Sequence, residues 1–284
     1  MAAVLHAREF RVLSWNVHDL LGNPVALTRV LRGAQPDVVC LQEGPRWPGS
    51  RQRLASLARS AGLFYLAGGR RSAGTAVLVS VRAQATGARA WPLPVVGWRT
   101  RPRGFVRALV GLPGSIAVSV TCLHLGLQEH ERAAHVAELL CGLEPTGPPV
   151  VLAGDLNELP DGPSWRTLAT RARDPGAVAP ATFRAAAPRA RIDAVLVDPR
   201  VEVLSYGFPD GVDEADVVAA SDHRPVLAVL ALPPARPALS GQSAADGASE
   251  GDFRGKVPGG GGAVSAPGRA PARPPAAPGT GRCR

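Results

Sequence analysis

The chain has 284 residues, of which 45% are hydrophobic, 32 are Lys or Arg and 23 are Asp or Glu, so that the formal net charge is +9. With 32 glycines and four cysteines, this composition excludes a collagen, a coiled coil and a small disulfide-rich scaffold. The basic charge would favour an acidic partner such as nucleic acid, but Lys256 is the only lysine; an excess of Arg, Ala, Gly and Pro is typical of GC-biased coding, so charge alone assigns no partner.

The N-terminal residues carry no recognisable targeting signal. His6, Arg8 and Glu9 interrupt the stretch that a signal peptide would need to be apolar. No run in the chain reaches the roughly 20 apolar residues that a membrane span needs. We therefore expect a cytoplasmic protein without stable membrane insertion, in which residues 1–9 form a short extension.

Short apolar runs alternate with helical patterns from residue 10 to residue 234. The runs predict strands at 10–17, 37–42, 75–81, 105–112, 115–123, 149–154, 192–197 and 224–232. Helices are predicted at 24–34, 51–61, 128–143 and 163–171. Leu112–Ser115, with the sequence Leu-Pro-Gly-Ser, is typical of a hairpin turn. About 225 residues of this kind suit one large α/β or two-sheet domain.

The last segment of the chain, residues 235–284, differs in composition from the rest. More than half of its residues are Gly, Pro or Ala, and large apolar side chains are rare. Such a segment cannot bury enough apolar area to offset the entropy of ordering it. We expect a disordered tail.

Polar and acidic side chains interrupt the apolar runs where the predicted strands begin or end. These residues are Asn16, Glu43, His124, Asp155, Asn157, Asp193, Asp222 and His223. If the strand ends converge, the four carboxylates among them repel one another and favour a divalent cation. Oxygen ligands suit Mg²⁺, Mn²⁺ or Ca²⁺ better than Zn²⁺.

Each of these residues also has a structural interpretation when taken alone. Gly154-Asp155 is typical of a turn after a strand, Glu43 of a solvated loop, and His124 of a hydrogen-bonded core histidine. Asn16 can cap a turn, and Asp222 can mark the start of a strand. Their joint occurrence at the ends of successive apolar runs is what favours a functional site.

As an ordered set, these motifs resemble the endonuclease/exonuclease/phosphatase superfamily, which includes DNase I, exonuclease III, inositol-polyphosphate 5-phosphatases and neutral sphingomyelinases. The matching pieces run over most of the predicted domain. They are SWN (14–16), PDVVCLQE (36–43), GTAVLVS (74–80), TCLHL (121–125), GDLN (154–157), RID (191–193) and SDHRPV (221–226). The resemblance implies a DNase I-like four-layer α/β/β/α sandwich with two mixed β-sheets flanked by helices.

The resemblance also implies a role for each residue in the hydrolysis of phosphate esters. Asn16, Glu43 and Asp222 would coordinate or support the metal, Mg²⁺ or Mn²⁺, with Glu43 as its principal ligand. Asp155 and Asn157 would orient the attacking water, and Asp193 would hold His223 in the correct tautomer. His124 would contact a phosphate oxygen or assist the leaving group.

Two departures from the family pattern concern His124. The exonuclease III branch has a tyrosine region at this place, which disfavours an abasic-site nuclease. In DNase I a glutamate on a neighbouring strand supports the equivalent histidine, and residues 74–84 contain no acid here. We therefore expect the backbone or the metal to orient His124.

Two further segments combine arginine with glycine or aromatic residues. Residues 68–74, Gly-Gly-Arg-Arg-Ser-Ala-Gly, form either a loop that contacts phosphate or a plain connection. In the proline-rich loop that starts at Trp91, the two tryptophans are interpreted as packing residues, and the roles of Arg99, Arg101 and Arg103 stay open.

The favoured function is a divalent-metal-dependent phosphodiesterase, endonuclease-like in its chemistry. One alternative is a phosphatase or phospholipase C-like enzyme on small or lipid phosphates; another is a non-catalytic binding scaffold. We expect a monomer whose partner is a phosphate-ester substrate, with nucleic acid as one candidate.

Overall fold

The computed structural model describes residues 7–97 and 100–235. Its strands are β1 (Arg8–Asn16), β2 (Val38–Gln42), β3 (Phe64–Gly68), β4 (Ala76–Val79), β5 (Gln84–Pro92), β6 (Gly104–Gly111), β7 (Ala117–His124), β8 (Val150–Asp155), β9 (Asp193–Val197), β10 (Glu202–Gly207) and β11 (Val226–Leu232). Its helices are α1 (Pro24–Ala34), α2 (Ser50–Ser60), α3 (Glu129–Leu140), α4 (Pro163–Ala169) and α5 (Glu214–Ala220), with 3₁₀ turns η1 (His18–Leu20) and η2 (Arg70–Ser72).

The strands form two mixed sheets. One sheet has the order β10-β11-β1-β2-β4-β3, and the other has the order β5-β6-β7-β8-β9. The pairs β1–β2 and β7–β8 are parallel, and the remaining pairs are antiparallel. Both parallel pairs need a long crossover, which α1 and α3 supply.

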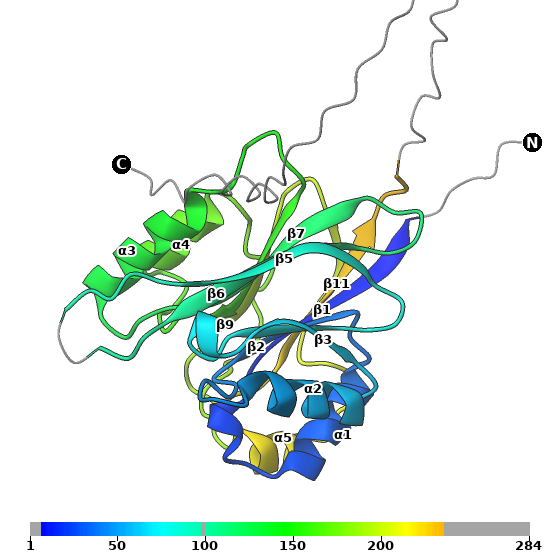
Figure 1. The fold of residues 1–284 in the computed structure, drawn as a ribbon. Helices are drawn as coiled ribbons and strands as arrows, with labels where there is room; N and C mark the ends of the chain where they lie inside the picture. The colour runs from blue at the N-terminus through cyan, green and yellow to red at the C-terminus, as the bar shows by residue number, and fades with distance from the viewer. Residues whose placement is uncertain (1–6, 98–99, 236–284) are drawn as a thin grey trace, which may run out of the picture. The chain divides into compact units, whose positions relative to one another are not determined.

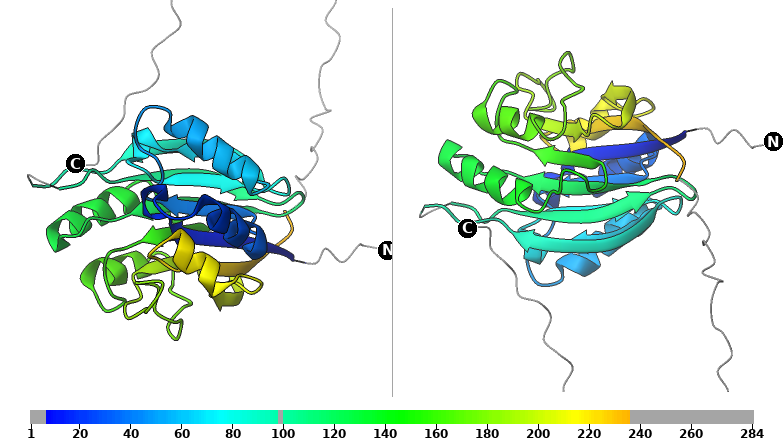
Figure 2. Two further views of the ribbon diagram at one scale, coloured as in Figure 1. Left: turned by 90° about the horizontal axis from the view of Figure 1, so that it is seen from below. Right: turned by 90° about the horizontal axis from the view of Figure 1, so that it is seen from above.

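The helices cover the outer faces of the two sheets. Helices α1, α2 and α5 lie on the first sheet, and α3 and α4 lie on the second, as Figure 1 shows and the perpendicular views in Figure 2 confirm. Helix α1 begins where the sequence signals it, because Pro24 occupies its first turn and the Asn23 side chain accepts hydrogen bonds from two backbone N–H groups. The architecture is the expected four-layer α/β/β/α sandwich.

The core between the sheets explains where the functional side chains lie. Alternate residues of a strand face the same side, and the rows that face the other sheet are apolar, among them Val12 in β1, Val120 in β7 and Val195 in β9. At one end of the sandwich, the inward-facing positions of these strands are occupied by polar residues instead. The residues at that end are Asn16, Gln42, His124, Asp155 and Asp193. The polar cluster is thus an extension of the inner face of the sandwich.

Two thiols occupy this inner layer, one in each sheet. Cys40 of β2 and Cys122 of β7 are both fully buried and free, and they interact with each other. The thiol of Cys122 also donates to the backbone carbonyl of Leu41 at 3.2 Å. Burial raises the pKa of Cys40 well above its ordinary value.

The sequence-based elements agree with the structure except at the sheet edges. Each predicted helix and strand has an observed counterpart, and Gly114 has a φ of 77° in the predicted hairpin turn. Strands β3, β5 and β10 and helix α5 were not predicted. Strand β1 begins at Arg8, inside the predicted extension of residues 1–9. The predicted tail lies outside the described residues from residue 236 onward. Within the described ranges, no helix combines the length and apolar character that crossing a bilayer requires.

Candidate active site

Asp155 lies at the centre of the polar end of the inner face. It ends β8 and is 1% exposed. Its Oδ2 atom accepts a hydrogen bond from Asn16 Nδ2 at 3.0 Å and lies 3.3 Å from His124 Nε2 and 3.9 Å from His223 Nε2. Its Oδ1 atom accepts a hydrogen bond from the backbone N–H of Asn157 at 2.9 Å. The structure therefore brings these four predicted site residues around one carboxylate.

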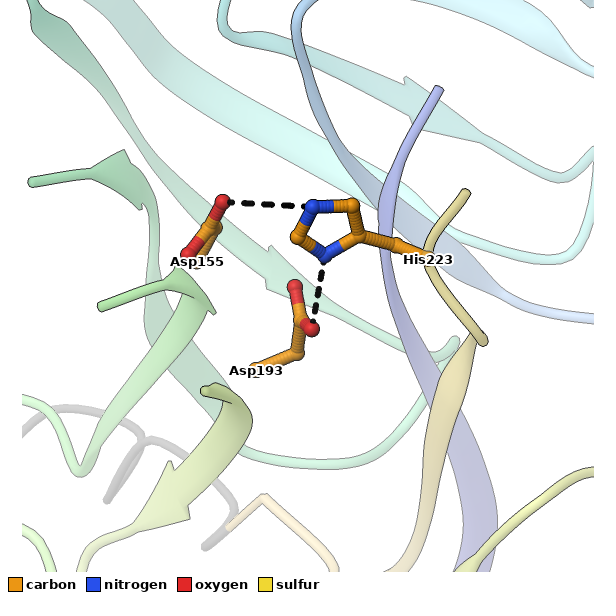
Figure 3. Close-up of side chains that lie close together, drawn as sticks. All are labelled: Asp155, Asp193 and His223. Atoms are coloured by element: carbon orange, nitrogen blue, oxygen red, sulfur yellow. Dashed lines mark hydrogen bonds and ion pairs between the residues drawn. The ribbon is translucent and has the colours of Figure 1, made fainter. Parts of the chain in front are cut away.

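Asp193 and His223 form a hydrogen-bonded pair beside Asp155. Asp193 is the register partner of Asp155 in the sheet, and its Oδ2 atom lies 2.9 Å from His223 Nδ1 (Figure 3). The ring of Phe183 packs against the imidazole with centroids 4.8 Å apart. The indole N–H of Trp15 donates to the backbone carbonyl of His223 at 2.9 Å. Contacts to Asp193 and Phe183 therefore fix the imidazole ring of His223, and the hydrogen bond from Trp15 fixes its backbone.

The charges in this cluster shift two pKa values toward neutral or basic pH. Burial alone would lower the pKa of His223, but the charge of Asp193, its hydrogen bond and the charge of Asp155 raise it to about 9. Burial, followed by the charge of Asp193, raises the pKa of Asp155 to about 7. At neutral pH the imidazole is protonated and the Asp155 carboxyl group is near its midpoint, which suits it to exchange a proton.

His124 is held in a different protonation state. Burial, followed by the charge of Arg103, lowers its pKa well below the ordinary value, so the ring is neutral at pH 7. Arg103 Nη1 lies 3.4 Å from its Nδ1 atom, and Asn157 Nδ2 lies 3.1 Å from its Nε2 atom. The ring has side-chain partners, where the sequence led us to expect the backbone or the metal.

Glu43 and Asp222 lie at the rim of the cluster. The Glu43 side chain is 16% exposed, and its Oε1 atom lies 3.8 Å from Arg103 Nη1 and 3.9 Å from Arg101 Nη1. The Asp222 side chain is 37% exposed, and its Oδ1 atom lies 3.8 Å from His18 Nδ1. Of the four carboxylates expected to meet, Asp155 and Asp193 lie together, whereas Glu43 and Asp222 are on the periphery.

The backbone is strained next to these side chains. Glu43 and Asn157 have φ values of 51° and 49°, and the three residues of η1 have φ values from 48° to 57°. For residues other than glycine this left-handed conformation costs about 1 kcal/mol or more, although asparagine tolerates it better. Such strain is concentrated at functional sites. Here it directs the side chains of Glu43, Asn157 and His18 toward the polar end of the sandwich.

Two groups of side chains at this end of the sandwich are candidates to hold a hard divalent cation: the buried cluster of Asp155, Asp193 and His223, and Glu43 at the rim with Asn16 and Asp222. Ligand atoms of Asp155, Asp193 and His223 all lie within 4.8 Å of one another, and the group is buried. Asp193 Oδ1 and Gln42 Oε1 are buried acceptors without a hydrogen-bond partner in the part of the chain that the structure describes. Burial, followed by the charge of Asp193, raises the pKa of Asp155. Carboxylate and amide oxygens are the ligands that Mg²⁺ and Mn²⁺ prefer.

Sequence reasoning left the role of one buried residue open. Arg103 is 5% exposed and connects His124 to Glu43. It precedes β6 in a segment whose prolines predicted a loop, and neither its spacing nor its type distinguishes it from Arg101. Trp98 and Arg99 of the same segment lie outside the described residues.

A small hollow adjoins Asp222. It has a volume of about 280 Å³, and its lining includes His18, Leu21, Arg184, Ser221 and Asp222. Most of its lining is apolar, and Arg184 adds a positive charge to it. The hollow offers room beside the cluster for a part of a ligand that does not react.

Residues 13–223 match the model of the Endonuclease/Exonuclease/phosphatase family. A search of curated proteins found no match.

Solved structures share the fold at low sequence identity. An endonuclease/exonuclease/phosphatase from Bacteroides vulgatus is 20% identical, with a TM-score of 0.63 over 79% of this chain and 99% of that one. A mannosyl-6-phosphatase from Bacteroides thetaiotaomicron is 18% identical, with a TM-score of 0.61 over 78% and 99% of the two chains. The catalytic domain of human Nocturnin, with a bound sulfate anion, is 17% identical, with a TM-score of 0.58 over 79% and 94%.

Proposed function

Because the chain belongs to the Endonuclease/Exonuclease/phosphatase family, whose members are hydrolases of phosphate esters, we propose that it is a divalent-metal-dependent phosphodiesterase that cleaves its substrate by attack of water. The observation that carries the proposal is the environment of Asp155. A single buried carboxyl group with a pKa of about 7 faces Asn16, His124 and His223. A general base works best when its pKa is near the operating pH.

Asp155 is the residue that we assign to proton transfer. Its carboxylate orients the attacking water and takes one of its protons as the new P–O bond forms and the ester P–O bond breaks; the leaving oxygen then takes up a proton from solvent. The backbone N–H of Asn157 donates to Oδ1, and Asn16 donates to Oδ2, so both oxygens are fixed in direction. The base is therefore already held in its reactive position when the substrate binds, which reduces the entropy lost on reaching the transition state.

His223 and His124 contact the phosphate in this proposal, each in its own protonation state. Protonated His223, fixed by Asp193, stabilises negative charge on the phosphate oxygens in the transition state. Neutral His124 forms a hydrogen bond to a phosphate oxygen or to the leaving oxygen without adding charge. Arg103, behind His124, contributes a positive potential to the same region.

We assign the metal to Glu43, with Asn16 and Asp222 in support. When bound, Mg²⁺ or Mn²⁺ would neutralise phosphate charge and polarise the P–O bond. Glu43 suits this role because its carboxylate has only two long ion pairs in the described residues, to Arg103 at 3.8 Å and to Arg101 at 3.9 Å. Asp155, Asp193 and His223 could hold a cation only if His223 released its proton, which its raised pKa opposes.

A phosphodiester is favoured over a monoester by the surroundings of the cluster. The hollow adjoins Asp222, and the guanidinium groups of Arg101 and Arg103 lie beside Glu43. A substrate that continues on both sides of the scissile phosphate can contact both. The mannosyl-6-phosphatase from Bacteroides thetaiotaomicron shares the fold, so monoester hydrolysis is the alternative that an experiment must separate.

The test is hydrolysis of bis-p-nitrophenyl phosphate and p-nitrophenyl phosphate with Mg²⁺, Mn²⁺ or EDTA. We expect EDTA-sensitive cleavage that favours the diester. His223→Asn should lower the rate by about 10²–10⁴-fold, whereas His130→Asn, an exposed histidine on α3, should not. A preference for the monoester would mean that the protein is a phosphatase and not a phosphodiesterase. The proposal would be contradicted by folded protein that binds Mn²⁺ but hydrolyses neither of the two esters nor an oligonucleotide.

The metal assignment has its own readout in Mn²⁺ affinity. Titration with Mn²⁺, followed by electron paramagnetic resonance, should show weaker binding in Glu43→Gln. Asp193→Asn should leave the affinity largely unchanged. The reverse pattern would assign the ion to the buried cluster of Asp155, Asp193 and His223.

A further inference from the structure

A groove lies where the edges of the two sheets meet. Strands β3 and β5 are edge strands of different sheets and lie next to each other (Figure 1). The groove has a volume of about 530 Å³. The side chains that matter for its chemistry are Arg51, Tyr65, Arg71, Arg89 and Trp91. No acidic residue is part of its lining.

The three arginines of this groove leave their charges uncompensated. Arg51, Arg71 and Arg89 are exposed, and no carboxylate within the described ranges forms an ion pair with any of them. They come from α2, η2 and β5, three elements far apart in the sequence. Elsewhere on the surface, exposed arginines such as Arg29 and Arg200 are paired with aspartates. The groove therefore concentrates positive charge.

Two aromatic rings lie among these arginines. Tyr65 is half-buried, its hydroxyl donates to the Gly68 carbonyl at 3.0 Å, and the Arg51 guanidinium lies 6.0 Å from its ring centroid. Trp91 stacks on Phe105 with ring centroids 5.0 Å apart and planes at 15°. One face of the indole is thus covered, and the ring is fixed in place. Aromatic rings and exposed guanidinium groups that line one groove are the combination that binds single-stranded nucleic acid, because bases stack on rings and phosphates pair with arginine.

The groove starts at the same end of the sandwich as the catalytic cluster. Gly68 in β3 pairs with Ala76 in β4, and Ala76 pairs with Leu41, two residues before Glu43. In the other sheet, Trp91 pairs with Phe105, whose partner in β7, Leu123, directly precedes His124. The C-terminal ends of β3 and β5 therefore both lie toward the cluster.

The glycine-rich segment 68–74 joins the groove to the cluster. The backbone N–H of Gly44, next to Glu43, donates to the Gly74 carbonyl at 2.7 Å. Gly104, next to Arg103, packs so closely that a Cβ atom there would lie 2.6 Å from backbone atoms of Ser72. A chain that leaves the cluster past Arg103 meets Arg71 and then the groove.

We propose that this arginine and aromatic groove binds the sugar-phosphate backbone and bases of a single-stranded nucleic acid whose scissile phosphate lies at Asp155. The inference rests on the proposed phosphodiesterase function and names its substrate class. Duplex nucleic acid does not expose its base faces for stacking, and a mononucleotide has a single base and a single phosphate for a groove that offers two rings and three arginines. The groove therefore favours an unpaired strand of several nucleotides.

The test measures binding separately from cleavage. Fluorescence anisotropy of a labelled single-stranded DNA of about 12 nucleotides, in EDTA, is compared for the wild type, the double variant Arg51→Glu/Arg89→Glu, and the control Arg59→Glu/Arg166→Glu. The control makes the same change in net charge at two exposed arginines that have no acidic partner in the described residues. Far-UV circular dichroism checks that both variants fold.

We expect the groove variant to bind at least about tenfold more weakly than the control. The slope of log K against log salt concentration should also fall by about 1.4, because each phosphate contact to a single strand contributes about 0.7. Equal affinities of the two variants would overturn the proposal, as would wild-type protein that does not bind the oligonucleotide. An equal loss for a duplex of the same length would overturn the assignment to a single strand.

Hydrolysis of bis-p-nitrophenyl phosphate separates this inference from the proposed function. This small diester occupies the cluster without reaching the groove, so the groove variant should hydrolyse it at the wild-type rate. Diester hydrolysis without oligonucleotide binding would overturn the groove and leave the phosphodiesterase in place. Oligonucleotide binding that depends on the groove, without hydrolysis of either ester, would support the groove and contradict the phosphodiesterase.

Discussion

Two buried aspartates lie at the two ends of strand β9, and they differ in how completely their carboxylates are hydrogen-bonded. Asp193 begins the strand at the catalytic cluster, and Asp198 directly follows it at the far end of the sandwich. Asp198 accepts hydrogen bonds from the backbone N–H groups of Val150 and Arg200 and from the side chains of Arg171 and Arg200, at 2.8–3.1 Å. The Asp193 carboxylate contacts His223 Nδ1 through its Oδ2 atom, and its Oδ1 atom has no hydrogen-bond partner in the described residues.

The difference shows how a carboxylate that stabilises the fold can be distinguished from one that is available for chemistry. A buried carboxylate with all its acceptor sites filled has a low pKa, and the pKa of Asp198 lies below its ordinary range because its arginine partners outweigh the cost of burial. At the other end, burial and mutual repulsion raise the pKa of Asp155. Buried acceptors left without partners are uncommon, and here they occur beside the proposed site.

The largest expected effect is on turnover in Asp155→Asn. The amide keeps the shape of the side chain but cannot accept the proton, so kcat for bis-p-nitrophenyl phosphate should fall by about 10³-fold. The metal-free variant should be at least as resistant to urea as the wild type, because a repulsive charge has been removed. Turnover close to that of the wild type would exclude Asp155 as the base, and clear destabilisation would mean that its charge supports the fold.

The next effect is the pH dependence of stability in the metal-free protein. The pKa of His223 is raised from 6.5 to about 9, so its protonated form is favoured by folding. This contribution is complete below pH 6.5 and is lost as the pH rises through 9, which corresponds to about 3 kcal/mol. Urea unfolding in EDTA should therefore show falling stability over this interval.

Asp193→Asn identifies the origin of this pH dependence. The neutral amide no longer raises the pKa of His223, so the fall in stability between pH 6.5 and 9 should become much smaller. Asp198→Asn serves as the matched control and should keep the wild-type dependence in this range. If both variants behave alike, the assignment of the titration to the Asp193–His223 pair fails.

The smallest effect is expected for Asp198→Asn, on stability alone. Loss of its charge-assisted hydrogen bonds should lower the free energy of unfolding by about 2 kcal/mol at pH 7. Because the folded pKa of Asp198 is depressed, its contribution is present above the unfolded pKa, near 4, and is lost as the pH falls below it. In the variant, the free energy of unfolding should therefore fall less steeply as the pH is lowered below about 4 than it does in the wild type. The value of kcat per folded molecule should stay unchanged. A large loss of kcat would contradict the separation of the two ends of β9.

The central strands and most of the polar residues at their ends could be predicted from the sequence, because strands that are buried on both faces have continuous apolar sequences. Runs such as that of β8 are apolar on both faces, and a polar residue at their end stands out. The edge strands could not be predicted in this way. β3 and β5 are partly exposed and contain glycine or proline. The sequence of β5 has no apolar run, and that of β3 has only a short one that ends at Gly68-Gly69. Their identity as strands depends on pairing with β4 and β6.

Parts of the site depend on contacts that no local pattern encodes. Arg103 acts on His124 across 21 positions of sequence, and in its segment it is one of several arginines beside prolines. Likewise, the family resemblance drew attention to Glu43 and Asp222, yet it gave no indication that they would lie at the rim while Asp155 and Asp193 are fully buried. Burial is a property of the assembled sandwich.

The two buried thiols between the sheets make it possible to measure how often the two sheets separate. Cys40 and Cys122 are fully buried, and the raised pKa of Cys40 keeps it as an unreactive thiol. An alkylating reagent can therefore modify either residue only while the two sheets are apart. The rate of modification at these two positions, followed by mass spectrometry of their peptides, reports how often the sandwich opens. The rate of cysteine modification can be compared with the rate at which activity is lost under the same conditions. Faster loss of activity would show that the catalytic end opens on its own, and equal rates would show that it opens only when the two sheets separate.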